Sequence, residues 1–141
     1  MKKLFFILIL FSIIFTACEP EVKGNPDRFK LGVFEVPGKD GVVSKSTIIR
    51  IDSLQIEKYT KYREISTDSG VFVKEEKRID TFYIKWKNNF FYTLRMKSPK
   101  TDLDKELASF QITKIKANSY DFSMKIGYSK YKQEGTVYKI K

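Results

Sequence analysis

The chain has 141 residues, of which 27 are basic, 17 are acidic and none is histidine. Without histidine it lacks the commonest general base near neutral pH and the commonest ligand of transition metals, so neither a Ser–His–Asp nor a Cys–His mechanism can be assembled. The sequence also contains no phosphate-binding or nucleophile-elbow motif. We therefore expect a protein that is not an enzyme and that holds no metal and no cofactor.

The N-terminus has the pattern of a bacterial lipoprotein signal. Two lysines precede an apolar stretch over residues 4–15, which is shorter than the roughly 20 residues of a transmembrane helix and is typical of a signal peptide. Residues 15–17, Phe-Thr-Ala, are followed directly by Cys18, the only cysteine; this arrangement resembles a lipobox. We predict that residues 1–17 are the signal, and that acyl chains such as palmitate on Cys18 anchor the protein to the inner or outer membrane of the cell envelope. The alternative for Cys18 is a buried free thiol.

A tether and one domain are predicted after the signal. Residues 18–28 contain two prolines, a glycine and several charges, which is typical of a flexible tether. Residues 29–141 have the length of a single domain. Without the two signal lysines the chain has 25 basic and 17 acidic residues, a formal charge of +8. This charge either favours anionic envelope components or simply keeps an aromatic β-surface soluble.

Apolar and polar side chains alternate from residue 29 onward, with the two-residue period of β-strands. In chain order, the predicted strands are residues 29–36, 46–51, 54–59 with an extension over 61–66, 71–77, 82–87, 90–96, 110–115, 120–128 and 136–140. Asp52-Ser53 and Asn88-Asn89 are predicted hairpin turns. Residues 103–108 form at most a short helical turn. Ile115 falls out of phase with Ile112, which indicates a bulge or a bend.

The number and spacing of these segments predict the fold class. Seven to nine short strands without a convincing helix indicate an all-β antiparallel meander. Such a meander tends to close because closure removes exposed edges. We therefore expect a small lipocalin-like barrel or a strongly curved sheet.

Several segments together resemble a known group of proteins. They are the lipobox cysteine and residues 27–34, 50–57, 84–94, 112–122 and 135–140. The set is similar to small lipoproteins of Bacteroidetes, flavobacteria especially, with lipocalin-like sheets. Some members carry the name of DNA topoisomerase IV. That activity is not expected here, because the chain is too short for a strand-passing enzyme and the signal directs it away from the chromosome.

Six aromatic residues on predicted inward faces are the candidate ligand-binding residues. They are Phe82, Trp86, Phe90, Tyr92, Phe122 and Tyr128. Small barrels hold one small ligand or are filled by side chains, so these rings either line a pocket at the barrel mouth or form a solid core.

Two other patterns carry weaker signals. Asp102, Asp104 and Glu106 alternate as calcium ligands do, but the glycine and the full ligand set of a calcium loop are missing, which favours a solvated acidic loop or the start of a helix. Basic and aromatic residues interleave at 59–63, 85–87 and 128–132, a pattern that suits single-stranded nucleic acid. Ordinary strand alternation, with aromatic residues inward and lysines outward, explains it better in an exported protein, so we expect no nucleic-acid partner.

Two functions are compatible with these observations. The first is a non-catalytic, membrane-anchored module that binds a small apolar ligand or an envelope component. The alternative is a structural module that holds another envelope protein through its sheet surface.

Overall fold

A computed structural model describes residues 21–141, so the predicted signal peptide and Cys18 lie outside the described residues. The strands are β1 (Glu21–Val22), β2 (Gly32–Val36), β3 (Ser46–Ile51), β4 (Leu54–Thr67), β5 (Gly70–Asn88), β6 (Phe91–Met96), β7 (Ala108–Ile115), β8 (Ser119–Ile126) and β9 (Gln133–Lys139). The two short helical segments are η1 (Pro26–Phe29) and α2 (Asp102–Lys105). Within the described residues, no helix is long and apolar enough to cross a membrane.

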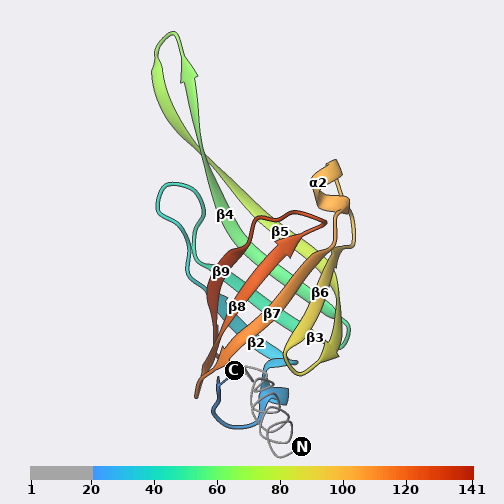
Figure 1. Cartoon of the computed structure of the whole chain (residues 1–141). Coiled ribbons are helices and arrows are strands. Elements are labelled where there is room, and N and C mark those ends of the chain that lie inside the picture. Colours follow the sequence, from blue (N-terminus) through green and yellow to red (C-terminus); the bar gives the residue numbers. More distant parts are fainter. Residues whose placement is uncertain (1–20) are drawn as a thin grey trace, which may run out of the picture.

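Strands β2 to β9 form a closed antiparallel barrel of eight strands (Figure 1). Each strand pairs with its neighbour in sequence, and the ring closes where β9 pairs with β2. β1 stays outside the ring and pairs in parallel with Lys114 and Ile115 at the end of β7. The predicted all-β meander is confirmed, and it closes into a barrel.

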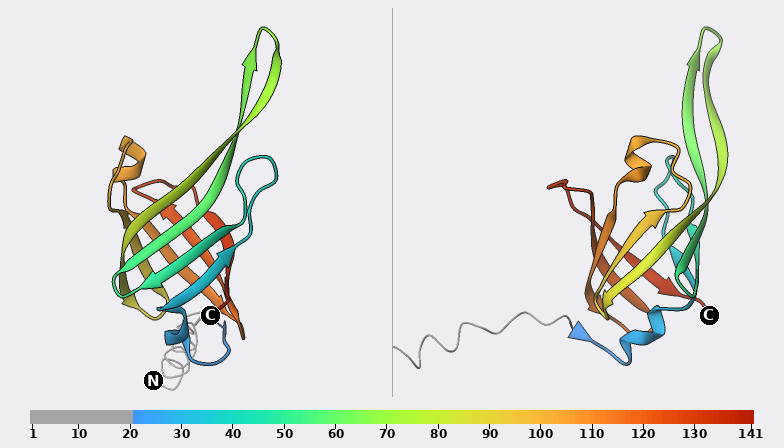
Figure 2. Two further views of the ribbon diagram at one scale, coloured as in Figure 1. Left: turned by 180° about the vertical axis from the view of Figure 1, so that it is seen from behind. Right: turned by 90° about the vertical axis from the view of Figure 1, so that its right-hand side faces the viewer.

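The two ends of the barrel differ (Figure 2). At the closed end, η1 lies beneath the strands and places the fully buried ring of Phe29 in the core. At the open end lie α2 and the loops over residues 37–45 and 127–132. The hairpin of β4 and β5 projects far beyond this end.

The strands differ from the prediction in one place and agree with it in another. Residues 71–77 and 82–87, predicted as separate strands, belong to the single strand β5, because continuous pairing with β4 runs from Gly70 to Tyr83. The predicted irregularity in β7 is present as a register shift between Ile112 and Lys114. It lets both Ile112 and Ile115 point into the core, where 1% and 0% of their surfaces are exposed.

Residues 21–28, which the sequence assigns to a flexible tether, instead pack against the closed end. The backbone N–H of Lys23 donates to the carbonyl of Ile115, 3.0 Å away, and continues the pairing of β1. The guanidinium of Arg28 donates to the carbonyl oxygens of Lys23 and Lys116. These contacts hold the segment because they satisfy backbone groups that strand ends otherwise leave to water.

Candidate functional site

Arg50, a fully buried arginine on β3, organises the closed end of the barrel interior. Its Nε donates to Gln55 Oε1 at 2.7 Å, and its Nη1 donates to the carbonyl of Phe29 at 2.7 Å. Its Nη2 donates to the hydroxyls of Tyr92 at 3.0 Å and Tyr120 at 2.7 Å. The guanidinium therefore joins β3, β4, η1, β6 and β8 through neutral partners.

Aromatic rings surround this guanidinium. The carbon at its centre lies 4.9 Å from the ring centre of Phe34, 4.8 Å from that of Tyr92 and 5.6 Å from that of Trp86. Such cation–π contacts gain strength when the cation is desolvated. Burial raises the pKa of Tyr92 well above its ordinary value, so its hydroxyl stays protonated. The cluster forms a solid floor to the barrel.

A cavity of about 170 Å³ lies above this floor, inside the barrel. Its lining comes from β2, β3, β4, β6, β7, β8 and β9 and comprises Val36, Ser46, Ile48, Gln55, Glu57, Tyr92, Phe110, Phe122, Met124 and Val137. Most of this surface is apolar or aromatic, and its polar groups gather on the β3–β4 side. The barrel is thus filled at one end and hollow above it.

Over residues 21–141, Glu57 is the only residue with a carboxyl side chain that lines this cavity. Its Oε1 accepts a hydrogen bond of 2.6 Å from Gln55 Nε2, so Gln55 links Glu57 to Arg50. Among the described residues, Oε2 of Glu57 has no hydrogen-bond partner. Burial raises the pKa of Glu57 above its ordinary value, with a smaller effect in the same direction from the charge of Asp80. The cavity therefore presents a carboxyl group that resists ionisation.

The pairing register explains why polar residues of β4 face the cavity. The two-residue turn at Asp52-Ser53 sets Arg50 opposite Gln55 and Ile48 opposite Glu57. Directly paired residues share a face of the sheet, so Gln55 and Glu57 point inward. The alternating apolar residues of β4 then lie on the outer surface.

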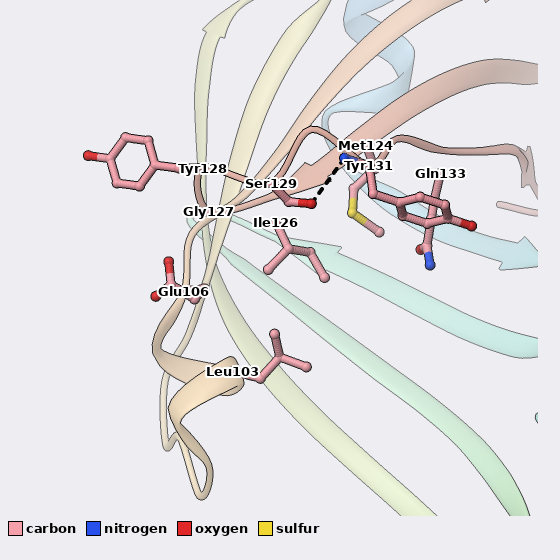
Figure 3. A pocket seen from close by; sticks show the side chains of 9 residues that line it. All are labelled: Leu103, Glu106, Met124, Ile126, Gly127, Tyr128, Ser129, Tyr131 and Gln133. Atoms are coloured by element: carbon pink, nitrogen blue, oxygen red, sulfur yellow. Dashed lines mark hydrogen bonds between the residues drawn. The ribbon is translucent and has the colours of Figure 1, made fainter.

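A second pocket of about 430 Å³ lies at the open end, between α2 and the loop that joins β8 to β9 (Figure 3). Leu103 of α2 and Ile126 of β8 face one another across it. The backbone N–H of Tyr131 donates to Ser129 Oγ at 3.0 Å and fixes the loop on the far side. Met124 lines both this pocket and the interior cavity, so the two spaces meet at that side chain.

The six aromatic residues singled out by the sequence occupy three different environments. Tyr92 and Phe122 line the interior cavity. Phe82, Trp86 and Phe90 are partly buried and pack against the core. Tyr128 borders the open-end pocket, but its ring is fully exposed and points away from it. The structure therefore brings two of the six together at the cavity.

Phe122 reaches the cavity across a glycine. It pairs with Gly135 on β9, and a Cβ at that position would lie 2.8 Å from Phe122 Cζ. The absence of a side chain lets the ring lie against the β9 backbone. A glycine opposite an aromatic residue is a sequence signal that this close packing exists.

Sequence reasoning missed the polar residues of the cavity and its floor, namely Ser46, Arg50, Gln55 and Glu57. Hydrophobic alternation alone would place Leu54 and Ile56 inside. The turn at Asp52-Ser53 was the available signal, because a two-residue hairpin turn fixes the register and sets Gln55 opposite Arg50.

Asp102 and Asp104 of the acidic loop belong to α2, and Glu106 is the residue that caps its C-terminal end. Asp104 Oδ2 accepts from the backbone N–H groups of Lys100 and Thr101, each at 3.0 Å, and Thr101 Oγ1 accepts from Asp104 N–H. This reciprocal pair is a capping box that starts the helix. Over residues 21–141, no group of three or more histidine, cysteine or acidic side chains is placed to hold a metal ion.

Comparison of the chain with protein-family models, curated proteins and solved structures finds no match.

Proposed function

We propose that this protein is a non-catalytic binding module of the cell envelope, anchored through Cys18, that holds a small apolar molecule, or the apolar part of a larger one, inside its barrel. The observation that carries this proposal is the interior cavity of about 170 Å³ above a solid floor. Small barrels use such a space for one ligand. Val36, Ile48 and Phe110 supply apolar contact, which provides most of the affinity in sites of this kind.

The polar side of the cavity limits the chemistry of the ligand. Glu57 Oε2 and the hydroxyl of Ser46 are polar groups of the lining that offer hydrogen bonds beside apolar walls. An anionic group placed there would be repelled once Glu57 ionises. The described residues also provide no set of metal ligands that could hold a neutralising metal ion beside it. The proposal therefore favours a ligand that is uncharged where it meets Glu57.

Native mass spectrometry of the protein purified from its own membrane tests the proposal. We expect a co-purifying apolar molecule. Ser46→Leu, which adds bulk on the cavity wall, should remove that molecule, whereas Thr47→Leu on the outer face of the same strand should retain it. Circular dichroism confirms that both variants are folded. Repeated absence of a ligand from the wild type, or its retention in Ser46→Leu, would refute the proposal.

The second candidate function, holding another envelope protein, is favoured by an apolar patch on the outer barrel surface. Ile51, Leu54 and Tyr83 are adjacent in the pairing of β3, β4 and β5. Ile51 is 59% exposed, Tyr83 is 49% exposed and the nearby Ile79 is 68% exposed. A contiguous exposed apolar patch is typical of an interaction site. A photo-crosslinking residue at position 83 should capture one discrete protein that the same residue at position 128 does not.

A further inference from the structure

The barrel wall has a side opening between β2 and β9. These strands pair through Phe34 with Lys139 and Glu35 with Tyr138, and Val33 extends the contact toward the closed end by backbone hydrogen bonds with Ile140 and Lys141. Beyond Glu35 they diverge, and a groove of about 750 Å³ separates residues 36–39 from residues 133–136. The β2–β9 ladder has two residue pairs, whereas every other pair of neighbouring strands in the barrel shares at least four.

The groove continues into the interior cavity. Val36, Phe122 and Met124 line both spaces. One water molecule takes roughly 30 Å³ in the liquid, so the cavity of about 170 Å³ accepts about five groups of that size. A methylene is of similar size, which means that a longer chain fits only if it extends from the cavity into the groove.

The rim of the groove carries basic side chains. Lys39, after β2, lies on one side of the groove and Lys132, before β9, lies on the other, and both lysines are exposed. Among the described residues, neither forms an ion pair, and Glu134 is the only carboxylate that lines the groove. The floor between the lysines is apolar, with Val43 beside the shared residues. A basic rim above an apolar floor is complementary to an anionic head on an apolar chain.

The two ends of the site fix the direction of such a molecule. The described lining of the cavity contains no basic side chain, so an anionic head inside the barrel would lie among apolar groups and the carboxyl group of Glu57 without a counter-charge. The lysines at the rim would attract the same head. The alkyl chain of the ligand therefore points into the barrel, and its head group stays outside.

We propose that the ligand of the barrel is a single-chain anionic amphiphile that enters between β2 and β9, with its chain in the cavity and its head held by Lys39 and Lys132. This inference rests on the proposed function, because it specifies the ligand of the same cavity. A free carboxylate and a phosphate ester share the required chemistry.

Isothermal titration of the purified full-length protein with alkyl carboxylates of six to twelve carbons, below their micellar concentrations, tests the length of the site. Each methylene buried in protein should raise the affinity about fourfold, and the rise should continue past six carbons. A plateau at about six carbons would overturn the inference while leaving binding inside the cavity intact, and Ser46→Leu should then abolish that residual binding.

The charge preference of the rim is tested with four ligands that share a twelve-carbon chain and differ in the head group: dodecanoate, dodecyl phosphate, dodecanol and dodecylamine. Both anions should bind more tightly than the alcohol and the amine, and the tighter of the two identifies the head that the rim prefers. The double variant Lys39→Glu/Lys132→Glu should weaken anion binding about tenfold and leave dodecanol unchanged, whereas Lys85→Glu on the outside of β5 should alter neither. Tighter binding of dodecylamine, or anion binding that the double variant does not weaken, would overturn the inference. The co-purification experiment judges the proposed function separately.

Discussion

The buried Arg50 and the partly buried Glu57 set the electrostatic character of the barrel interior, and Gln55 connects them. The oxygen of the Gln55 amide accepts from Arg50, and its nitrogen donates to Glu57. The orientation of that amide is therefore fixed from both sides. Gln55 thus links the two side chains without direct contact between them, which leaves one oxygen of Glu57 available to the cavity.

Arg50→Met should destabilise the closed end strongly. Methionine fills part of the volume but leaves the carbonyl of Phe29 and the amide of Gln55 without their donor. Each buried acceptor that loses its donor costs about 1 to 3 kcal/mol, and we expect the free energy of unfolding in urea to fall by about 2 to 6 kcal/mol for the two. Arg95→Met, at an exposed position on β6, should change it by less than about 0.5 kcal/mol. A loss below about 1 kcal/mol in Arg50→Met would contradict the structural role given to this network.

Glu57 should make the stability depend on pH. Because burial raises its pKa in the folded protein, its contribution to stability is fully present below the ordinary carboxyl pKa of 4.5 and is lost as the pH rises through the raised value. Glu57→Gln keeps the acceptor for Gln55 and removes the titration. Urea unfolding at several pH values should therefore show the variant gaining stability relative to the wild type between pH 4 and pH 8. Parallel profiles would show that Glu57 is solvated.

Among the secondary-structure elements, the hairpin of β4 and β5 divides into two parts. Its root forms the barrel wall and carries an ordered polar cluster, in which Tyr59 donates to Asp80 Oδ2 at 2.6 Å and Arg78 bridges Asp80 and Glu76. In its outer part, residues 63–74, the two strands pair with each other, and Val71, Phe72 and Val73 are exposed. Regions with few buried contacts open at a lower free energy than the core.

Removal of residues 63–74, with Tyr62 and Glu75 joined by an Asn-Gly turn, should leave the barrel intact. We expect thermal unfolding to stay cooperative and the free energy of unfolding to change by less than about 1 kcal/mol. A matched deletion of residues 59–78 removes the polar cluster at the root and should destabilise the protein by more. If the shorter deletion alone prevents folding, the outer hairpin is part of the folding unit.

The elements show which parts of the fold were predictable from the sequence. Alternation located the strands wherever one face is apolar and the other polar, as in β8, and the phase change at Ile115 located the bulge in β7. It failed on β4, because Leu54 and Ile56 are apolar yet lie outside, while Gln55 and Glu57 lie inside. The cavity could not be predicted from the sequence for the same reason. Its polar wall follows from the pairing register, and its side opening follows from where β2 and β9 diverge. The hydrophobicity of the residues encodes neither.

For the whole molecule, the position of the N-terminal segment has a consequence for the proposed anchor. Glu21 pairs at the closed end of the barrel, and three residue steps from Cys18 to Glu21 span at most about 11 Å. An anchor on Cys18 would therefore hold the closed end near the lipid surface. The open end and the hairpin, which lie on the opposite side (Figure 1), would face away from that membrane.

This orientation is testable with an environment-sensitive fluorophore attached to a single new cysteine, since an acylated Cys18 does not react with the label. The label on Lys23→Cys, at the closed end, should be quenched by lipids that carry a quencher in the headgroup, whereas the label on Ser69→Cys, at the hairpin tip, should not. Cys18→Ala should abolish acyl labelling, release the protein from membranes and remove the quenching at position 23. Equal quenching at both positions would mean that residues 21–28 detach from the barrel on the membrane. Membrane retention of Cys18→Ala would instead refute the anchor itself.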